Sequence, residues 1–137
     1  MAPVRVLVVD ADWKMRRLIR TNLEAQGLQV IEATRGHEAL EALRSRPCEL
    51  VLLSVELPDG NGWNIVSALQ RTPAGRNLPI VVITGEAVRS RLLQRFPCVS
   101  PLLTPFSVAD LLESVERALQ ASEQKKEECP HAPDDRE

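Results

Sequence analysis

Residues 4–12 read Val4-Arg5-Val6-Leu7-Val8-Val9-Asp10-Ala11-Asp12, and this stretch decides the fold. A compact apolar run of this kind is typical of a strand that is buried on both faces of a parallel sheet, because a half-exposed strand alternates apolar and polar residues. The acidic segment that follows ends it sharply. We predict four further strands, at Leu28 to Ile31, Leu50 to Leu53, Ile80 to Ile83, and Leu102 and Leu103.

Segments with helical periodicity alternate with these strands. Met15, Ile19 and Leu23 fall on one helix face, and Gly27 is a natural stop. Four more helices are predicted around Ala39 to Leu43, around Ile65 and Leu69, over Glu86 to Phe96, and from the capping pattern of Ser107 and Asp110 onward. Strands alternating with helices through short connections imply right-handed crossovers. The predicted fold class is therefore α/β, a doubly wound five-stranded parallel sheet of the flavodoxin-like type with helices on both faces.

Length and composition fit one such domain. The chain has 137 residues, of which 44% are hydrophobic and 26% charged, and its net charge is −2. We assign residues 1–120 to the domain. Residues 121–137 carry three basic and six acidic side chains without an apolar period, so we expect a disordered tail after at most an extra turn of helix. The body of the chain then has a charge of +1, which gives no broad electrostatic reason to bind nucleic acid or an anionic membrane.

The sequence also indicates a compartment. No stretch approaches the ~18 consecutive apolar residues of a membrane-spanning helix, and the first residues lack the pattern of a signal peptide. Three widely spaced cysteines, Cys48, Cys98 and Cys129, fit neither a set of disulfides nor a zinc site, and we expect reduced thiols. We therefore expect a cytoplasmic protein.

The candidate site residues lie where the predicted strands end. In an open parallel sheet, ligands bind outside the carboxyl ends of the strands. The residues at these ends are Asp10, Ala11, Asp12, Ser54, Thr84 and Thr104. Asp10 and Asp12 are a weak candidate for a cation site, but Asp12 directly precedes a helix, where capping is the favoured role.

Five motifs in order resemble the receiver domain of two-component response regulators, and together they span nearly all of residues 4–120. They are Val8-Val9-Asp10, Gly36-His37-Glu38-Ala39-Leu40, Val55-Glu56-Leu57-Pro58 through Gly62, Thr84 after an apolar strand, and Thr104-Pro105-Phe106. The resemblance implies a receiver-type fold. It also implies that Asp10 and Thr84 hold positions that receivers use.

Three other positions depart from the receiver pattern. Receivers of the usual type accept a phosphoryl group on an aspartate that closes the third strand. An acidic pair after the first strand helps this aspartate to hold Mg²⁺, and a lysine before the Pro-Phe pair contacts the phosphoryl group. By position, Ser54 stands at the phosphoacceptor, Ala11 at the direct metal ligand and Thr104 at the lysine.

Each departure removes a different part of the chemistry. A hydroxyl forms no acyl phosphate and is a weak nucleophile without a positioned base. Mg²⁺ usually takes one or two carboxylates, and only a remnant, Asp10 and Asp12, is left to supply them. Thr104 brings no positive charge to a phosphoryl oxygen. We therefore expect a receiver fold outside the usual phosphorylation cycle, with no metal site and no cofactor.

The resemblance also implies a switch and interaction face on the fourth helix, fifth strand and fifth helix. Leu102 stands where many receivers carry a rotating aromatic side chain, and Pro105 where they carry a cis peptide bond. Pro97 and Pro101 lie in a shortened interval, which predicts a short fourth helix. The residues assigned to this face are Leu102, Pro105, Phe106, Arg89, Arg91 and Arg95.

These expectations combine into a stand-alone pseudo-receiver, a phosphorylation-independent protein–protein interaction module of bacterial-type signal transduction. Its partner would be another signalling protein or a second copy. No helix-turn-helix segment follows, and no nucleic-acid partner is expected. One alternative is a flavodoxin-like small-ligand-binding protein, although the acidic loop of residues 10–13 lacks glycine. Another is a receiver regulated by an unconventional signal at the degenerate pocket. We do not expect an enzyme, because His37 and His131 form no Ser-His-Asp or Cys-His set.

Overall fold

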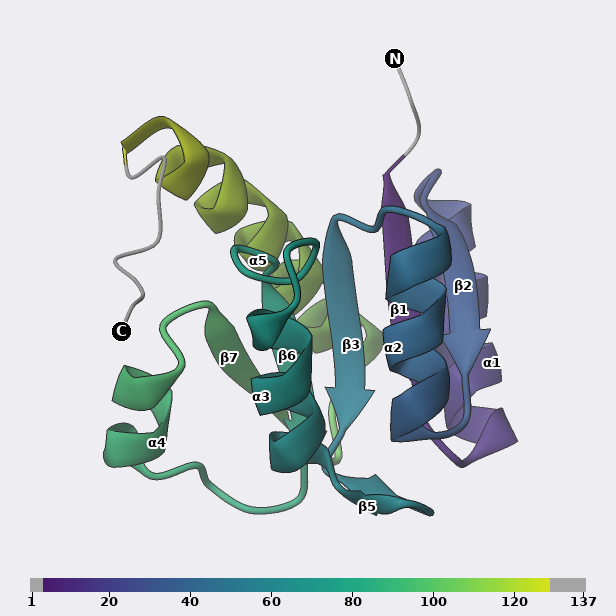
Figure 1. Ribbon diagram of the computed structural model, residues 1–137. Coiled ribbons are helices and arrows are strands. Elements are labelled where there is room, and N and C mark those ends of the chain that lie inside the picture. Colours follow the sequence, from purple (N-terminus) through teal and green to yellow (C-terminus); the bar gives the residue numbers. More distant parts are fainter. Residues whose placement is uncertain (1–3, 129–137) are drawn as a thin grey trace.

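Uninterrupted apolar runs form the centre of the sheet. The computed structural model describes residues 4–128 and contains a five-stranded sheet with the strand order β2-β1-β3-β6-β7 (Figure 1). All four neighbouring pairs are parallel. The strands are β1 (Arg5–Val9), β2 (Gln29–Ala33), β3 (Leu50–Ser54), β6 (Ile80–Thr84) and β7 (Val99–Leu103). This confirms the predicted doubly wound α/β fold.

Helices cover both faces of the sheet, as Figure 1 shows. Because successive side chains of a strand point to opposite faces, β1 contributes Leu7 and Val9 to one core, and Val6 and Val8 to the other. The first core packs against α2, α3 and α4, and the second against α1 and α5. The helices are α1 (Trp13–Ala25), α2 (Gly36–Ser45), α3 (Gly62–Arg71), α4 (Ser90–Arg95) and α5 (Val108–Glu128).

Side-chain caps begin three of these helices next to the carboxyl ends of strands. Asp12 and Asn61 each accept a hydrogen bond from the second following backbone N–H, at 2.9 and 2.7 Å, and so start α1 and α3. Ser107 and Asp110 bond reciprocally, side chain to backbone N–H, at 3.0 Å in both directions. The predicted capping roles of Asp12 and of the Ser107–Asp110 pair are confirmed.

The structure differs from the prediction near the end of the sheet. The last strand begins at Val99 rather than Leu102 and includes Pro101. Because the Thr104 N–H donates to the carbonyl of Thr84 and the bonding alternates along β7, the nitrogen of Pro101 faces the free edge, where a proline is tolerated. A small hairpin of β4 (Glu56–Leu57) and β5 (Gly60–Asn61) also follows β3.

The predicted domain boundary at residue 120 falls inside α5, which continues to Glu128. Two further turns of helix therefore stand where a tail was expected. The rest of the expected tail, residues 129–137 with Cys129 and His131, lies outside the described residues. Between residues 4 and 128, no helix has the length and apolarity needed to cross a membrane.

Candidate functional site

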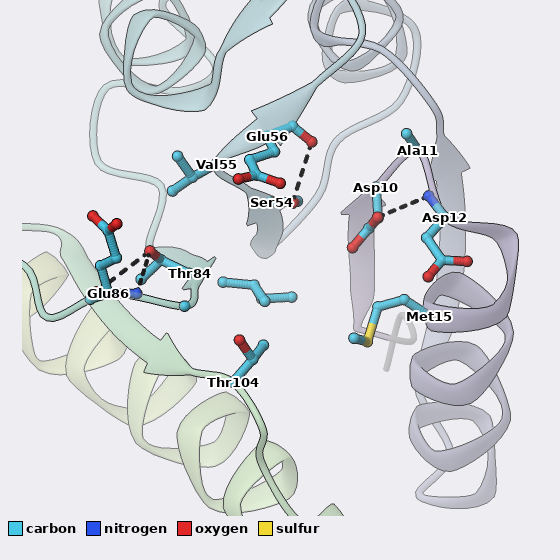
Figure 2. Close-up of a pocket in the computed structure, with 12 residues that line it drawn as sticks. Asp10, Ala11, Asp12, Met15, Ser54, Val55, Glu56, Thr84, Glu86 and Thr104 are labelled. Carbon is cyan, nitrogen blue, oxygen red and sulfur yellow. Dashed lines mark hydrogen bonds between the residues drawn. The ribbon is translucent and has the colours of Figure 1, made fainter.

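A cavity of about 690 Å³ opens where β1, β3, β6 and β7 end (Figure 2). It lies at this edge because the carboxyl ends of parallel strands meet there. The structure brings all six predicted pocket residues together in its lining: Asp10, Ala11, Asp12, Ser54, Thr84 and Thr104.

Glu56 and Glu86 also line the cavity, although neither is among the residues predicted from the strand ends. Each lies two residues beyond a predicted site residue, Ser54 and Thr84 respectively. The loops after β3 and β6 turn back over the sheet edge, so residues beyond the strand end still face the cavity. Extending the strand-end rule by two residues would have found both glutamates.

Asp10 is held firmly at the floor of the cavity. It is only 6% exposed, and its Oδ1 accepts the backbone N–H of Asp12 at 2.9 Å. Its own carbonyl accepts a hydrogen bond from Nη1 of Arg16 at 2.6 Å. Burial raises the pKa of the Asp10 carboxyl above its ordinary value of 3.8, although the Asp12 N–H and the charge of Arg16 act in the opposite direction.

Replacing Asp10 with asparagine is expected to stabilise the fold. Because the folded pKa lies above the unfolded one, the native state binds the proton more tightly, and stability falls as pH rises from 3.8 through the folded pKa. The ionised carboxylate therefore opposes folding at pH 7. Asp10→Asn keeps an oxygen for the Asp12 N–H, and we expect it to raise Tm by a few degrees at pH 7 in calorimetry.

The comparison for this measurement is Glu116→Gln, which removes one charge from an exposed residue at the opposite end of the sheet. It should leave Tm nearly unchanged. A lower Tm for Asp10→Asn at pH 7 would contradict the destabilising role of the Asp10 charge.

Two of the three hydroxyl groups that line the cavity, those of Ser54 and Thr84, bond to the backbone of the loops that follow them. Ser54 Oγ donates to the carbonyl of Glu56 at 3.4 Å, and Thr84 Oγ1 donates to the carbonyl of Glu86 at 3.3 Å. In the described part of the chain, no hydroxyl of the cavity bonds to a histidine, lysine or carboxylate side chain, so none has the base that an activated nucleophile needs. The Thr104–Pro105 bond is cis, as the resemblance implies.

The charged side chains that line the cavity are acidic. Its lining contains four carboxylates, from Asp10, Asp12, Glu56 and Glu86, and no lysine or arginine among the described residues. Within residues 4–128, no three histidine, cysteine or acidic side chains are grouped closely enough to hold a metal ion. The cavity is therefore acidic without forming a metal-sized cluster, and it repels anions.

Two basic side chains of α1, Arg16 and Arg20, belong to an ion-pair network with acidic residues that do not line the cavity. Arg16 Nε lies 2.9 Å from Glu32 Oε1, and Arg20 bonds to Glu32 at 2.6 Å and to Glu24 at 3.0 Å. These bonds lower the pKa of Glu32 and raise that of Arg20. Arg16 and Arg20 are thus paired with acidic side chains along α1 and β2.

A second acidic residue ties the loop after β3 to the start of α2. Asp59 accepts the backbone N–H groups of Gly36 and His37 at 2.9 and 3.1 Å, and it also contacts His37 Nδ1 at 3.1 Å. The N-cap residue of α2, Arg35, supplies no side-chain hydrogen bond, so Asp59 caps this helix from a distant loop. The bonds from Gly36 and His37 hold the pKa of Asp59 down at about 2.

Asp59→Asn is expected to lower Tm by several degrees at neutral pH, because an amide cannot accept both backbone bonds. A depressed folded pKa gives stability that is present above the unfolded value of 3.8 and lost as pH falls toward about 2. The difference in Tm should therefore shrink over this interval in a pH series. Glu41→Gln, on the exposed side of α2, is the matched control; a pH-independent difference would rule out the ionised cap.

The residues predicted for the interaction face differ in exposure. Arg91 and Arg95 are exposed on α4, a helix of six residues, and Arg89 is its exposed N-cap residue. Leu102, however, is 7% exposed and packs in the core under α5, whereas Leu103 is 47% exposed. The reason is the alternation of side chains along β7. Leu102 therefore contributes its side chain to the core, and Leu103 is the exposed leucine of β7 beside it.

Two other residues of this face lie at the start of the loop before α5. Pro105 is exposed and Phe106 is half-buried against the second core. A groove of about 600 Å³ runs between β7 and α5, lined by Leu103, Pro105, Asp110 and Glu113 among others. The helices α5 and α4 pack on opposite faces of the sheet.

The fold and the cavity together define a receiver-type signalling domain. The chain matches the response regulator receiver domain family over residues 6–116, and it belongs to that family. It is accordingly a receiver domain of two-component signalling.

Relatives and solved structures agree with this assignment. The chain is 25% identical over 119 residues to the polar-differentiation response regulator DivK of Brucella anthropi, covering 85% of this chain and 97% of that protein. A sensor protein from Polaromonas sp. JS666 is similar in structure, with a TM-score of 0.78 and 29% identity over 88% of this chain and 99% of that one. The chemotaxis response regulator CheY4 of Vibrio cholerae has the same fold, with a TM-score of 0.80, 24% identity, and coverage of 86% and 100%.

Proposed function

We propose that this receiver domain is a pseudo-receiver, which binds its protein partner without a phosphorylation cycle. The observation that carries the proposal is the side chain at the end of β3, the family's phosphoacceptor position. Ser54 stands there, and its hydroxyl is bonded to the backbone of Glu56 rather than to a base.

The rest of the cavity supports the same conclusion. Phosphoryl transfer needs positive charge to balance the transferred group, and the described lining supplies four carboxylates and no basic side chain. Ala11 and Thr104 stand where the resemblance requires a metal-binding carboxylate and a lysine. A donor phosphate would therefore meet repulsion where a usual receiver provides Mg²⁺ and an ammonium group.

A receiver that is not phosphorylated presents its partner with the same binding surface under all conditions. The equilibrium between two conformations shifts only if a ligand binds them differently, and no phosphoryl group is available to do so here. We propose that the partner, another signalling protein or a second copy, binds the face of α4, β7 and α5. Support comes from the exposed Leu103 of β7, which lines a groove with Asp110 and Glu113 of α5, and from the exposed arginines of α4.

Amide spectra recorded with acetyl phosphate, or with beryllofluoride, in the presence of Mg²⁺ test the absence of a phosphorylation response. We expect no saturable shifts at Ser54, Thr84 or Thr104. Broad saturable shifts around the cavity would defeat the proposal, since they would report a working phosphoryl site.

The proposed face is tested by Leu103→Asp. The variant should keep the amide spectrum of a folded domain, because Leu103 contributes to neither core. Quantitative affinity capture from the source cell should lose the partner with this variant relative to wild type, and light scattering separates self-association from a second protein. Equal capture by both forms would place the partner elsewhere.

A further inference from the structure

One oxygen at the floor of the cavity has no hydrogen-bond partner. Oδ1 of Asp10 is occupied by the Asp12 N–H, but Oδ2 accepts no bond from any residue that the structure describes. Asp10 is 94% buried. Figure 2 shows its Oδ2 directed into the cavity. A buried carboxylate oxygen without a donor is costly, so the position favours a ligand that carries one.

Residues 4–128 supply no such donor. The guanidinium of Arg16 is the nearest candidate, but it is bonded to the carbonyl of Asp10 and to Glu32, outside the cavity. The hydroxyl of Thr104 lines the same space and has no hydrogen-bond partner among residues 4–128. The cavity thus presents an unsatisfied carboxylate oxygen and a free hydroxyl within a negatively charged lining.

The arrangement suits an organic cation better than a metal ion. Asp12 uses one carboxylate oxygen to cap α1, and within the described chain no three acidic side chains converge on a metal-sized site. A guanidinium group is larger, keeps its charge when buried, and offers a planar fork of N–H donors that matches a carboxylate. A volume of about 690 Å³ leaves ample room for it.

We infer that the cavity is a binding site for a guanidinium group, which the arginine side chain of the partner protein inserts against Asp10 and Thr104. The source of the arginine rests on the proposed function, whereas the site itself rests on the cavity. In this arrangement a partner's positive charge takes the place that Mg²⁺ and a lysine would share in a usual receiver. The partner is then recognised at a position where other receivers are phosphorylated.

The test is an amide-spectrum titration of the wild-type chain with N-acetyl-arginine-methylamide. The citrulline analogue, which has nearly the same shape but no charge, is the matched control probe. We expect saturable shifts at Asp12, Ser54 and Thr104 with the arginine probe, and binding at least about tenfold weaker with the citrulline probe. Equal binding of both probes, or no shifts in the cavity with either, would overturn the inference.

Two variants place the probe in the cavity. Asp10→Asn removes the charge that faces the guanidinium and should weaken binding about tenfold or more. Thr104→Lys puts an ammonium group into the cavity and should abolish binding, which tests the site independently of Asp10. Glu116→Gln changes the net charge equally at the other end of the sheet and should bind as wild type does. Unchanged affinity in both cavity variants would refute the site.

No phosphodonor and no partner takes part in this titration. A failure here therefore leaves the phosphorylation test of the proposed function unaffected. Conversely, a response of the chain to beryllofluoride would contradict the proposed function, and the absence of a response to the arginine probe would contradict the guanidinium site.

Discussion

The triple variant Ser54→Asp, Ala11→Asp, Thr104→Lys is expected to take up a phosphoryl group from acetyl phosphate with Mg²⁺, which wild type should not do. The three positions follow or end β3, β1 and β7 and line one cavity, so the new side chains would surround the same space. Two added carboxylates beside Asp10 supply ligands of the kind that Mg²⁺ prefers, and the lysine balances the charge of the phosphoryl oxygens. Intact-mass spectrometry should show a phosphate adduct on most chains.

The double variant Ala11→Asp, Thr104→Lys is the control. It has the restored metal ligand and the lysine but lacks the acceptor, and it should remain unmodified. The triple variant also has a thermal readout. Its two added carboxylates near Asp10 should lower Tm, and bound Mg²⁺ should raise Tm again as the Mg²⁺ concentration increases. A triple variant that folds, binds Mg²⁺ and stays unphosphorylated would show that the carried-over positions are not the ones that set the chemistry.

Patterns along the sequence predicted the central strands well because burial on both faces leaves a simple signature. β1, β3 and β6 lie within one residue of their predicted bounds. The edge strands were less well predicted. β2 continues through Glu32, whose side chain lies on the surface in the pairs with Arg16 and Arg20, so a polar residue there did not end the strand. Pro101 likewise lies within β7, although the predicted strand began only after this proline.

The site was predictable as far as topology determines it. Parallel strands end at one edge, and this alone assembled Asp10, Ser54 and Thr84 around one cavity. Contacts that depend on how loops fold back were not predictable. Asp59 reaches the backbone of residues more than twenty positions earlier, and no local pattern identifies it as the cap of α2. The exposure of Leu103 rather than Leu102 likewise depends on the exact phase of a short strand.

Gly62 packs against the backbone at the end of β3, next to the cavity. It begins α3 and donates its N–H to the carbonyl of Val55 at 2.6 Å. A Cβ at this position would stand 2.6 Å from the carbonyl oxygen of Ser54 and 2.8 Å from Cα of Val55. Both neighbours are backbone atoms, so no side-chain rotation relieves the overlap. The start of α3 and the end of β3 can approach this closely only because the residue is glycine.

Gly62→Ala is therefore expected to destabilise the fold by about 3 kcal/mol, at the upper end of the usual cost of overpacking. Separating α3 from β3 would also displace Ser54, so the amide signals of the cavity should shift together with the drop in stability. Urea unfolding with an unchanged m-value measures the first effect. Gly85→Ala is the matched control, because its nearest contact, Thr104 Oγ1 at 3.4 Å, is ordinary packing in the same cavity. If both variants lost the same stability, close approach at Gly62 would not be the cause.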